Sequence, residues 1–366
     1  MLIGIDASRA LRKKRTGTEL YCAEIIKYLT TIDHINRYRL YSSKKPTGDM
    51  AQVKGSNIDW RVMPFTLGWT LIRLSLEILF HAPDVLFMTA HSIPLLPGKK
   101  SVVIMHDIGF NHFPEIYKWI VKLYHRSTAI WIKHFATHII VPTEFTKQDI
   151  HNQYGISLNR ITVVPLGFEP KEYRPASKGE TPPLDTPYFY YIGRIEMRKN
   201  ISRLLEAFAE FKRQTGLPHK LVLAGGPAYG YASIQATYEN LGEYKKDVIM
   251  LGYTPQSKAL EYMRHAEALV FPSLFEGFGL PVLEAFASDT PVITSNTTSL
   301  PEVAGDAAIL VTPTKTNEIA DAMIKIAQDK EFRNELIQKG REQYKQFSWE
   351  RTARETLAVL EKVGNA

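Results

Sequence analysis

The first half of the chain alternates short apolar runs with amphipathic stretches, a pattern typical of parallel strands joined by helices. Apolar runs bounded by turn residues predict buried strands, and apolar residues at helical spacing predict helices. We expect strands at residues 2–7, 38–41, 85–88, 101–105, 137–141 and 161–165, and helices at residues 18–31 and 146–154. The pattern therefore predicts a parallel sheet covered by helices.

The second half repeats the pattern. We expect strands at residues 188–192, 220–224, 248–251, 268–271, 291–294 and 308–311, and helices beginning near residues 200, 233, 256, 280, 316 and 331. Between the halves the chain is rich in proline and lacks apolar periodicity, which is typical of a linker. The sequence thus predicts an α/β protein with domains at residues 1–168 and 188–349, a linker at 169–187 and a last helix at 350–366.

Two glutamates, Glu276 and Glu284, follow the predicted strand at residues 268–271. They are separated by Gly277-Phe278-Gly279 and by the start of a predicted helix at Leu280. Glycines let the backbone approach a ligand, and a helix N-terminus favours negative charge. Ionised carboxylates accept hydrogen bonds from both hydroxyls of a sugar. The pair alone leaves another interpretation open, namely a surface glutamate beside a turn and a helix-facing glutamate.

A second strand–loop–helix unit carries basic residues. The aromatic strand at residues 188–192 is followed by Gly193-Arg194, and Lys199-Asn200 precedes an amphipathic helix that Asn200 is expected to cap. Arg194 and Lys199 then lie at the carboxyl end of the sheet, where open α/β folds bind ligands. A guanidinium and an ammonium at this edge suit a diphosphate.

Together these motifs resemble the retaining nucleotide-sugar glycosyltransferases of family 4. Glu276 and Glu284 match the family's Glu-x7-Glu element, and residues 193–200 match its Gly-Arg…Lys-Asn element. Further segments stand in the family's order at Ile3–Ser8, Arg15–Glu19, His106-Asp107, Val141–Thr143, Val164–Gly167 and Leu300–Val303. The resemblance covers nearly the whole chain. It implies the GT-B fold: two Rossmann-like domains facing a cleft, the first binding the acceptor and the second the donor, with the C-terminal helix crossing back to the first domain.

The resemblance also implies a role for each motif residue in the second half. Arg194 and Lys199 would hold the departing diphosphate, where fixed cations count most in the transition state. Glu284 would hold the nucleotide ribose, and Glu276 the hydroxyls of the donor sugar. The backbone around Gly193 and the N–H groups of Gly277, Phe278, Gly279 and Leu280 would face the donor.

In the first half the resemblance singles out Gly17 and His106. Gly17 lies in the loop that opens the first helix, where its N–H would approach the diphosphate, and Thr16 and Glu19 form a capping-box pattern around it. The family usually has two consecutive glycines here, so the detail of this contact differs in the present chain. His106 follows the strand at residues 101–105 and would lie beside the reacting sugar; a helix-capping or buried histidine is the alternative.

The expected reaction is same-face transfer of a hexosyl group, in which the leaving phosphate accepts the proton of the incoming hydroxyl. A covalent role for Glu276 is the alternative, because paired carboxylates act so in retaining glycosidases. The chain contains no Asp-x-Asp motif, so we expect neither a metal nor another cofactor. Similarity to bacterial mannosyltransferases of surface-polysaccharide assembly suggests GDP-mannose and a glycan or lipid-linked saccharide. A UDP-sugar donor, a nucleotide-sugar epimerase and an inactive sugar-binding homologue stay open.

Charge and cysteine content bear on the location of the protein. The single cysteine, Cys22, excludes an intramolecular disulfide and fits a reducing, cytoplasmic compartment. Residues 1–170 hold 21 basic and 13 acidic residues, against 24 and 25 in residues 171–366. The amphipathic, basic and aromatic stretch at residues 117–134 predicts either a helix resting on the inner face of an anionic membrane or a core helix with a solvated face. No motif of a nucleic-acid-binding domain supports binding to nucleic acid.

Overall fold

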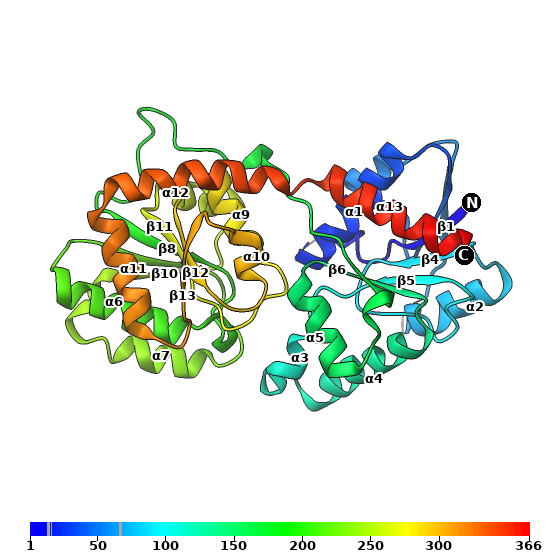
Figure 1. The fold of residues 1–366 in the computed structure, drawn as a ribbon, viewed down its shortest axis with the longest axis horizontal. Helices are drawn as coiled ribbons and strands as arrows, with labels where there is room; N and C mark the ends of the chain where they lie inside the picture. Colours follow the sequence, from blue (N-terminus) through cyan, green and yellow to red (C-terminus); the bar gives the residue numbers. More distant parts are fainter. Residues whose placement is uncertain (13–14, 16, 66–67) are drawn as a thin grey trace. The chain divides into compact units, whose positions relative to one another are not determined.

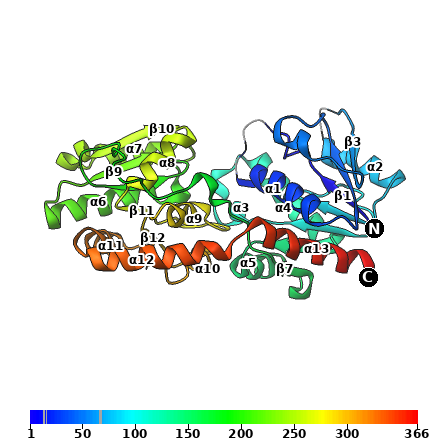
Figure 2. The same cartoon turned by 90° about the horizontal axis from the view of Figure 1, so that it is seen from above.

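The computed structural model describes all of the 366 residues except 13–14, 16 and 66–67, and the chain divides into two compact units. Unit 1 comprises Met1–Gly167 together with Phe347–Ala366, and unit 2 comprises Phe168–Gln346. Each unit is a parallel sheet with helices on its faces (Figures 1 and 2). The predicted α/β class with two parallel-sheet domains is therefore confirmed.

Within its described residues, unit 1 contains a seven-stranded sheet in the order β3-β2-β1-β4-β5-β6-β7. All neighbouring strands pair in parallel. The strand order reverses between β1 and β4, and ligands of open α/β sheets bind at the carboxyl ends beside such a switch point. The strands are β1 (Leu2–Asp6), β2 (Arg37–Ser42), β3 (Ile58–Val62), β4 (Val85–Met88), β5 (Ser101–Ile104), β6 (His138–Val141) and β7 (Ile161–Val163).

The edge strand β3 is absent from the predicted set. Its residues alternate between apolar Ile58, Trp60 and Val62 and polar Asp59 and Arg61, which is the signature of a half-buried strand. The longer runs of the central strands are buried on both faces and are easier to recognise. The main helices of unit 1 are α1 (Gly17–Ile32), α2 (Leu74–Phe80), α3 (Gly109–His112), α4 (Trp119–Phe135), α5 (Glu144–Tyr154) and α13 (Trp349–Asn365).

The C-terminal helix α13 packs on α1 in unit 1, as expected for a helix that crosses back to the first domain. Thr352 Oγ1 donates a hydrogen bond to the carbonyl of Pro165, with a distance of 2.8 Å. A Cβ at Gly167 would lie 2.5 Å from the Cα of Trp349, so this crossing requires glycine. None of the helices formed by the described residues combines the length and the apolar character needed to cross a membrane.

Unit 2 has a sheet of six strands in its described part, in the order β10-β9-β8-β11-β12-β13. Here the order reverses between β8 and β11, which pair in parallel. The strands are β8 (Tyr188–Ile192), β9 (Lys220–Ala224), β10 (Val248–Gly252), β11 (Ala268–Phe271), β12 (Val292–Ser295) and β13 (Ala308–Val311). The loops after β8 and β11, which carry the two main motifs, therefore leave neighbouring strands at the same edge.

Helix α6 (Ile201–Thr215) illustrates why unit 2 folds as predicted. Its apolar side chains at helical spacing are all buried: Ile201, Leu204, Leu205, Phe208 and Phe211. The other helices of this unit are α7 (Tyr231–Glu239), α8 (Gln256–His265), α9 (Leu280–Ala287), α10 (Leu300–Ala304), α11 (Thr316–Gln328) and α12 (Lys330–Gln343). Helix α9 begins at the residue expected from the glycine loop, whereas the short α10 is absent from the predicted helices.

Candidate active site

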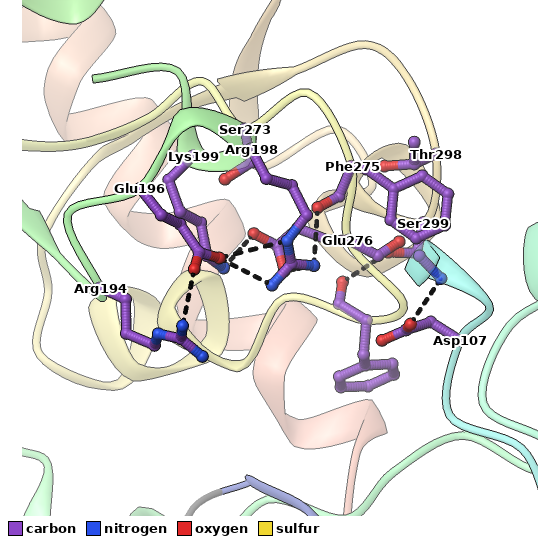
Figure 3. Close-up of polar contacts among 12 residues, drawn as sticks. Asp107, Arg194, Glu196, Arg198, Lys199, Ser273, Phe275, Glu276, Thr298 and Ser299 are labelled. Atoms are coloured by element: carbon purple, nitrogen blue, oxygen red, sulfur yellow. Dashed lines mark hydrogen bonds and ion pairs between the residues drawn. The ribbon is translucent and has the colours of Figure 1, made fainter. Parts of the chain in front are cut away.

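The loop after β8 and the loop after β11 are joined through their backbones in unit 2. The N–H of Leu274 donates to the carbonyl of Arg198 at 2.9 Å. The Arg198 guanidinium in turn donates to the carbonyl of Phe275 at 3.2 Å, as Figure 3 shows. These contacts hold the loop at residues 194–199 (the basic loop) and the loop at residues 276–279 (the glycine loop) together at the switch point of the sheet.

Lys199 and Glu276, which the sequence places 77 residues apart, form an ion pair through Lys199 Nζ and Glu276 Oε1 (Figure 3). Their side chains are 13% and 10% exposed. The ammonium also lies 5.0 Å from the centroid of the Phe271 ring, at the end of β11. A nearly buried ion pair is maintained only when each charge keeps its partner. The pair thus presents one fixed cation and one fixed anion side by side.

A second carboxylate lies inside the basic loop. Glu196 has a side chain only 2% exposed and pairs with Arg194 Nη2 at 3.1 Å and with Arg198 Nη2 at 3.2 Å. Arg198 Nη1 lies 3.9 Å from Glu276 Oε2, so the Arg198 guanidinium lies between the carboxylates of Glu196 and Glu276. The Arg194 side chain is 68% exposed and carries its guanidinium toward solvent. Glu196 and Arg198 are not among the site residues predicted from the sequence. Both lie within the motif at residues 193–200, and their charge there is the signal that points to them.

The predicted side-chain cap at Asn200 is wrong. Asn200 does precede α6, but it adopts a left-handed conformation with φ of 63°, and its side chain makes no capping hydrogen bond. Instead its Nδ2 donates to the carbonyls of Pro272 at 3.0 Å and Pro313 at 2.6 Å. The asparagine therefore ties the basic loop to the loops that follow β11 and β13.

Hydrogen bonds from Ser299, the residue before α10, hold the backbone of the glycine loop in place. Ser299 Oγ lies 2.9 Å from the carbonyls of both Glu276 and Phe278. Gly279 has φ of +113°, and a Cβ at this position would lie 2.7 Å from Leu300 Cδ2. Glycine is therefore required immediately before α9. The segment Gly277–Leu280 leads directly from Glu276 into the first turn of that helix.

Glu284 lies in the second turn of α9 and is partly buried. The Tyr173 hydroxyl donates to Glu284 Oε1 at 2.9 Å. Burial raises the pKa of Glu284, and the Tyr173 hydrogen bond opposes this rise. Tyr173 belongs to unit 2 although it comes from the proline-rich segment expected as the linker, and nothing in the sequence of that segment points to it.

His106 follows β5 in unit 1 and contacts His91 and Tyr21. Its backbone N–H donates a hydrogen bond to His91 Nε2 at 3.0 Å. Its ring contacts the Tyr21 ring edge-on, with 4.8 Å between the ring centroids. Burial and the neighbouring His91 lower the pKa of His106 to about 3. Its Nε2 is buried and has no hydrogen-bond partner among the described residues. His106 is therefore a neutral imidazole at physiological pH, and its place beside a reacting sugar stays a prediction.

Gly17 is the first residue of α1 and is exposed. A Cβ built on Gly17 meets no described atom within 4 Å, so packing does not demand glycine here. Thr16 of the expected capping box lies outside the described residues. Its partner Glu19 is buried and pairs with Arg12 at 3.1 Å and Arg9 at 3.7 Å.

Comparisons with known proteins identify the family of the chain. A model of the family described as glycosyltransferase family 4 matches residues 16–172, and one described as glycosyl transferases group 1 matches residues 174–343. The O-antigen chain mannosyltransferase B of Escherichia coli is 28% identical over an alignment of 387 positions that covers 96% of this chain and 98% of the relative.

Solved structures share the fold at low sequence identity. The sucrose-phosphate synthase of Thermosynechococcus elongatus superposes with a TM-score of 0.73 at 18% identity, covering 99% of this chain and 98% of that one. The HepE protein of Anabaena in complex with UDP and glucose gives a TM-score of 0.72 at 18% identity, with 99% of both chains covered. The two family models span both halves of the sequence, and the chain belongs to the family 4 glycosyltransferases with the GT-B fold.

Proposed function

We propose that the protein transfers mannose from GDP-mannose to a glycan or lipid-linked saccharide, with retention of configuration and without a metal. The observation that carries this proposal is the nearly buried Lys199–Glu276 pair at the switch point between β8 and β11, with Arg194 and Glu284 in the adjoining segments. The name of the Escherichia coli relative, an O-antigen chain mannosyltransferase, supports mannose as the sugar. A UDP-sugar donor remains the alternative.

In this proposal the two cations bind the diphosphate. Breaking the sugar–phosphate bond moves negative charge onto the departing diphosphate, and fixed cations stabilise that charge more in the transition state than in the ground state. Lys199 provides a shielded ammonium, and Arg194 a more exposed guanidinium. Their positive charges neutralise the diphosphate, as a bound divalent cation would.

The carboxylates bind hydroxyls. Glu276 accepts hydrogen bonds from the hydroxyls of the transferred sugar, and Glu284 accepts them from the ribose. The bond between the anomeric carbon and the phosphate oxygen breaks as the acceptor oxygen bonds to that carbon from the same face. The acceptor's proton passes to the leaving phosphate oxygen, so no enzyme base is required.

Peripheral contact with an anionic membrane is also part of the proposal. Helix α4 buries only Thr128, Ala129 and Ile132, and its first turns expose Trp119 by 70% and Ile120 by 62%. The second half of α4 packs on the core through Ala129 and Ile132, whereas the exposed apolar side chains of its first turns support membrane contact. Apolar side chains interspersed with lysines suit the interface of an anionic bilayer.

GDP is expected to stabilise the protein against heat without metal, and UDP, ADP, dTDP and CDP are expected to do so less. A ligand at about 100 times its Kd adds about 2.7 kcal/mol to the free energy of unfolding, which a thermal shift assay detects readily. Arg194→Ala should reduce the shift. A shift with UDP alone would replace GDP-mannose by a UDP-sugar, and a shift with none of the five would contradict the donor site.

Tyr173→Phe is expected to raise the pKa of Glu284, because the donating hydroxyl is lost while burial remains. Ribose binding uses the ionised carboxylate, so GDP affinity falls as the pH drops through the pKa of Glu284. In the variant this fall should begin at a higher pH. Calorimetric titration with GDP across about pH 5 to 8 measures the shift. Glu284→Gln should abolish the pH dependence, and superimposable wild-type and Tyr173→Phe profiles would refute the role of Tyr173.

A further inference from the structure

Unit 1 contains a pocket of about 770 Å³ at the carboxyl edge of its own sheet. The pocket is lined by the segments that follow β1, β2 and β4, which are adjacent in the order β2-β1-β4, and by the start of α4. The position beside the β1–β4 switch point is where an open α/β sheet binds ligands. Of the motif segments discussed above, only Ile3–Ser8 reaches the pocket, through Ser8, and none of the residues assigned to donor binding lines it.

The described lining residues are strongly basic. Arg9, Arg12, Lys44 and Lys45 line the pocket, and its described lining includes no carboxylate or side-chain amide. Glu19 pairs with both arginines, but Lys44 and Lys45 are exposed and form no ion pair with any described residue. Glycan recognition relies on carboxylate and amide groups, whereas a cluster of unneutralised cations suits phosphate groups.

The surroundings of the pocket are apolar. Trp69 and Leu71 line it from the turn that leads into α2, and Tyr124 lines it from α4. A Cβ on Gly68, another lining residue, would lie 3.2 Å from Ile72 Cδ1, so the Ile72 side chain lies beside that residue. Ile72 and Leu76 are 49% and 47% exposed, and Ile120, one helical turn before Tyr124, is exposed as well. Such surroundings suit a ligand that combines phosphate with a hydrocarbon group.

We propose that this pocket binds the diphosphate of a lipid-linked saccharide acceptor. The inference rests on the proposed glycosyl transfer and specifies the class of its acceptor. A phospholipid headgroup offers the same phosphate chemistry, but the four cationic side chains of the described lining match the higher charge of a diphosphate better than that of a single phosphodiester.

Geranyl diphosphate, geranyl monophosphate and geraniol serve as probes of the pocket, with affinities measured by calorimetry at saturating GDP. We expect the diphosphate to bind most tightly to the wild type. The double variant Lys44→Gln/Lys45→Gln should weaken it by about 10-fold, as expected for the loss of two partly solvated charge contacts. The matched control Lys54→Gln/Lys99→Gln removes the same charge from exposed positions of unit 1 outside this pocket and should bind like the wild type.

Binding to lipid vesicles distinguishes a lipid-linked diphosphate from a phospholipid headgroup as the source of the phosphate. Binding to phosphatidylglycerol vesicles should fall equally in the two double variants, because both lose two positive charges. A selective loss of vesicle binding by Lys44→Gln/Lys45→Gln with geranyl diphosphate binding intact would overturn the proposal in favour of a headgroup site. Equal loss of geranyl diphosphate binding in both variants would also overturn it. A normal GDP thermal shift without geranyl diphosphate binding would refute this pocket alone, whereas loss of the GDP shift in the wild type would refute the proposed donor.

Discussion

Lys199→Ala is expected to lower kcat by about 1000-fold, a loss of about 4 kcal/mol in transition-state stabilisation. The Lys199 ammonium is the more shielded of the two predicted diphosphate ligands, with its side chain 13% exposed against 68% for Arg194. A charge shielded from water stabilises developing negative charge more strongly than an exposed one. Steady-state kinetics with GDP-mannose, read as kcat and KM separately, measures the effect. Arg194→Ala should lower kcat by less.

Lys212→Ala is the matched control for this prediction. Lys212 is also nearly buried in unit 2, with its side chain 9% exposed, and its Nζ pairs with Asp247 at 2.9 Å. Removing Lys212 breaks a comparable ion pair outside the two loops, so it should reduce stability while leaving kcat of the folded enzyme unchanged. If Lys199→Ala and Lys212→Ala change kcat by the same factor, Lys199 only anchors Glu276 and does not stabilise the diphosphate.

The strands that carry the site are the part of the fold that the sequence predicts best. Strands β8 and β11 begin and end where their apolar runs do, because strands buried on both faces leave a continuous hydrophobic signal. Helix α9 begins at Leu280 as expected, since the glycine before it and the proline after its first residue both mark a helix start. Edge strand β3 and the short α10 have weaker patterns and are missed.

The contacts within the candidate site are less predictable, because they join segments that lie far apart in the sequence. The motifs identify Lys199 and Glu276, but not that the two side chains pair with each other. Ser299 and Tyr173 reach the site only through the tertiary fold, and their local sequence does not distinguish them from other polar residues. Asn200 shows the same limit: its position before the helix is predicted, but its side chain binds two distant carbonyls instead of capping.

Glu276→Gln is expected to lower kcat/KM by about 100-fold, which corresponds to about 2.7 kcal/mol. The amide keeps the size of the side chain but loses the charge that strengthens hydrogen bonds from sugar hydroxyls, and it leaves the Lys199 ammonium without its anion. Asp247→Asn is the control, because it removes the anion from the Lys212 pair and leaves the two loops unchanged.

The same variant tests the covalent alternative for Glu276. A carboxylate that binds sugar hydroxyls cannot be replaced by a small external nucleophile, so azide should not restore the activity of Glu276→Ala or Glu276→Gln. A nucleophilic Glu276 predicts the opposite result, since azide would attack the anomeric carbon in its place and yield a glycosyl azide. The Lys199 ion pair favours the first outcome. It holds Glu276 Oε1 in a fixed charge pair, while Ser299 Oγ donates a hydrogen bond to the backbone carbonyl of Glu276 and fixes the glycine loop.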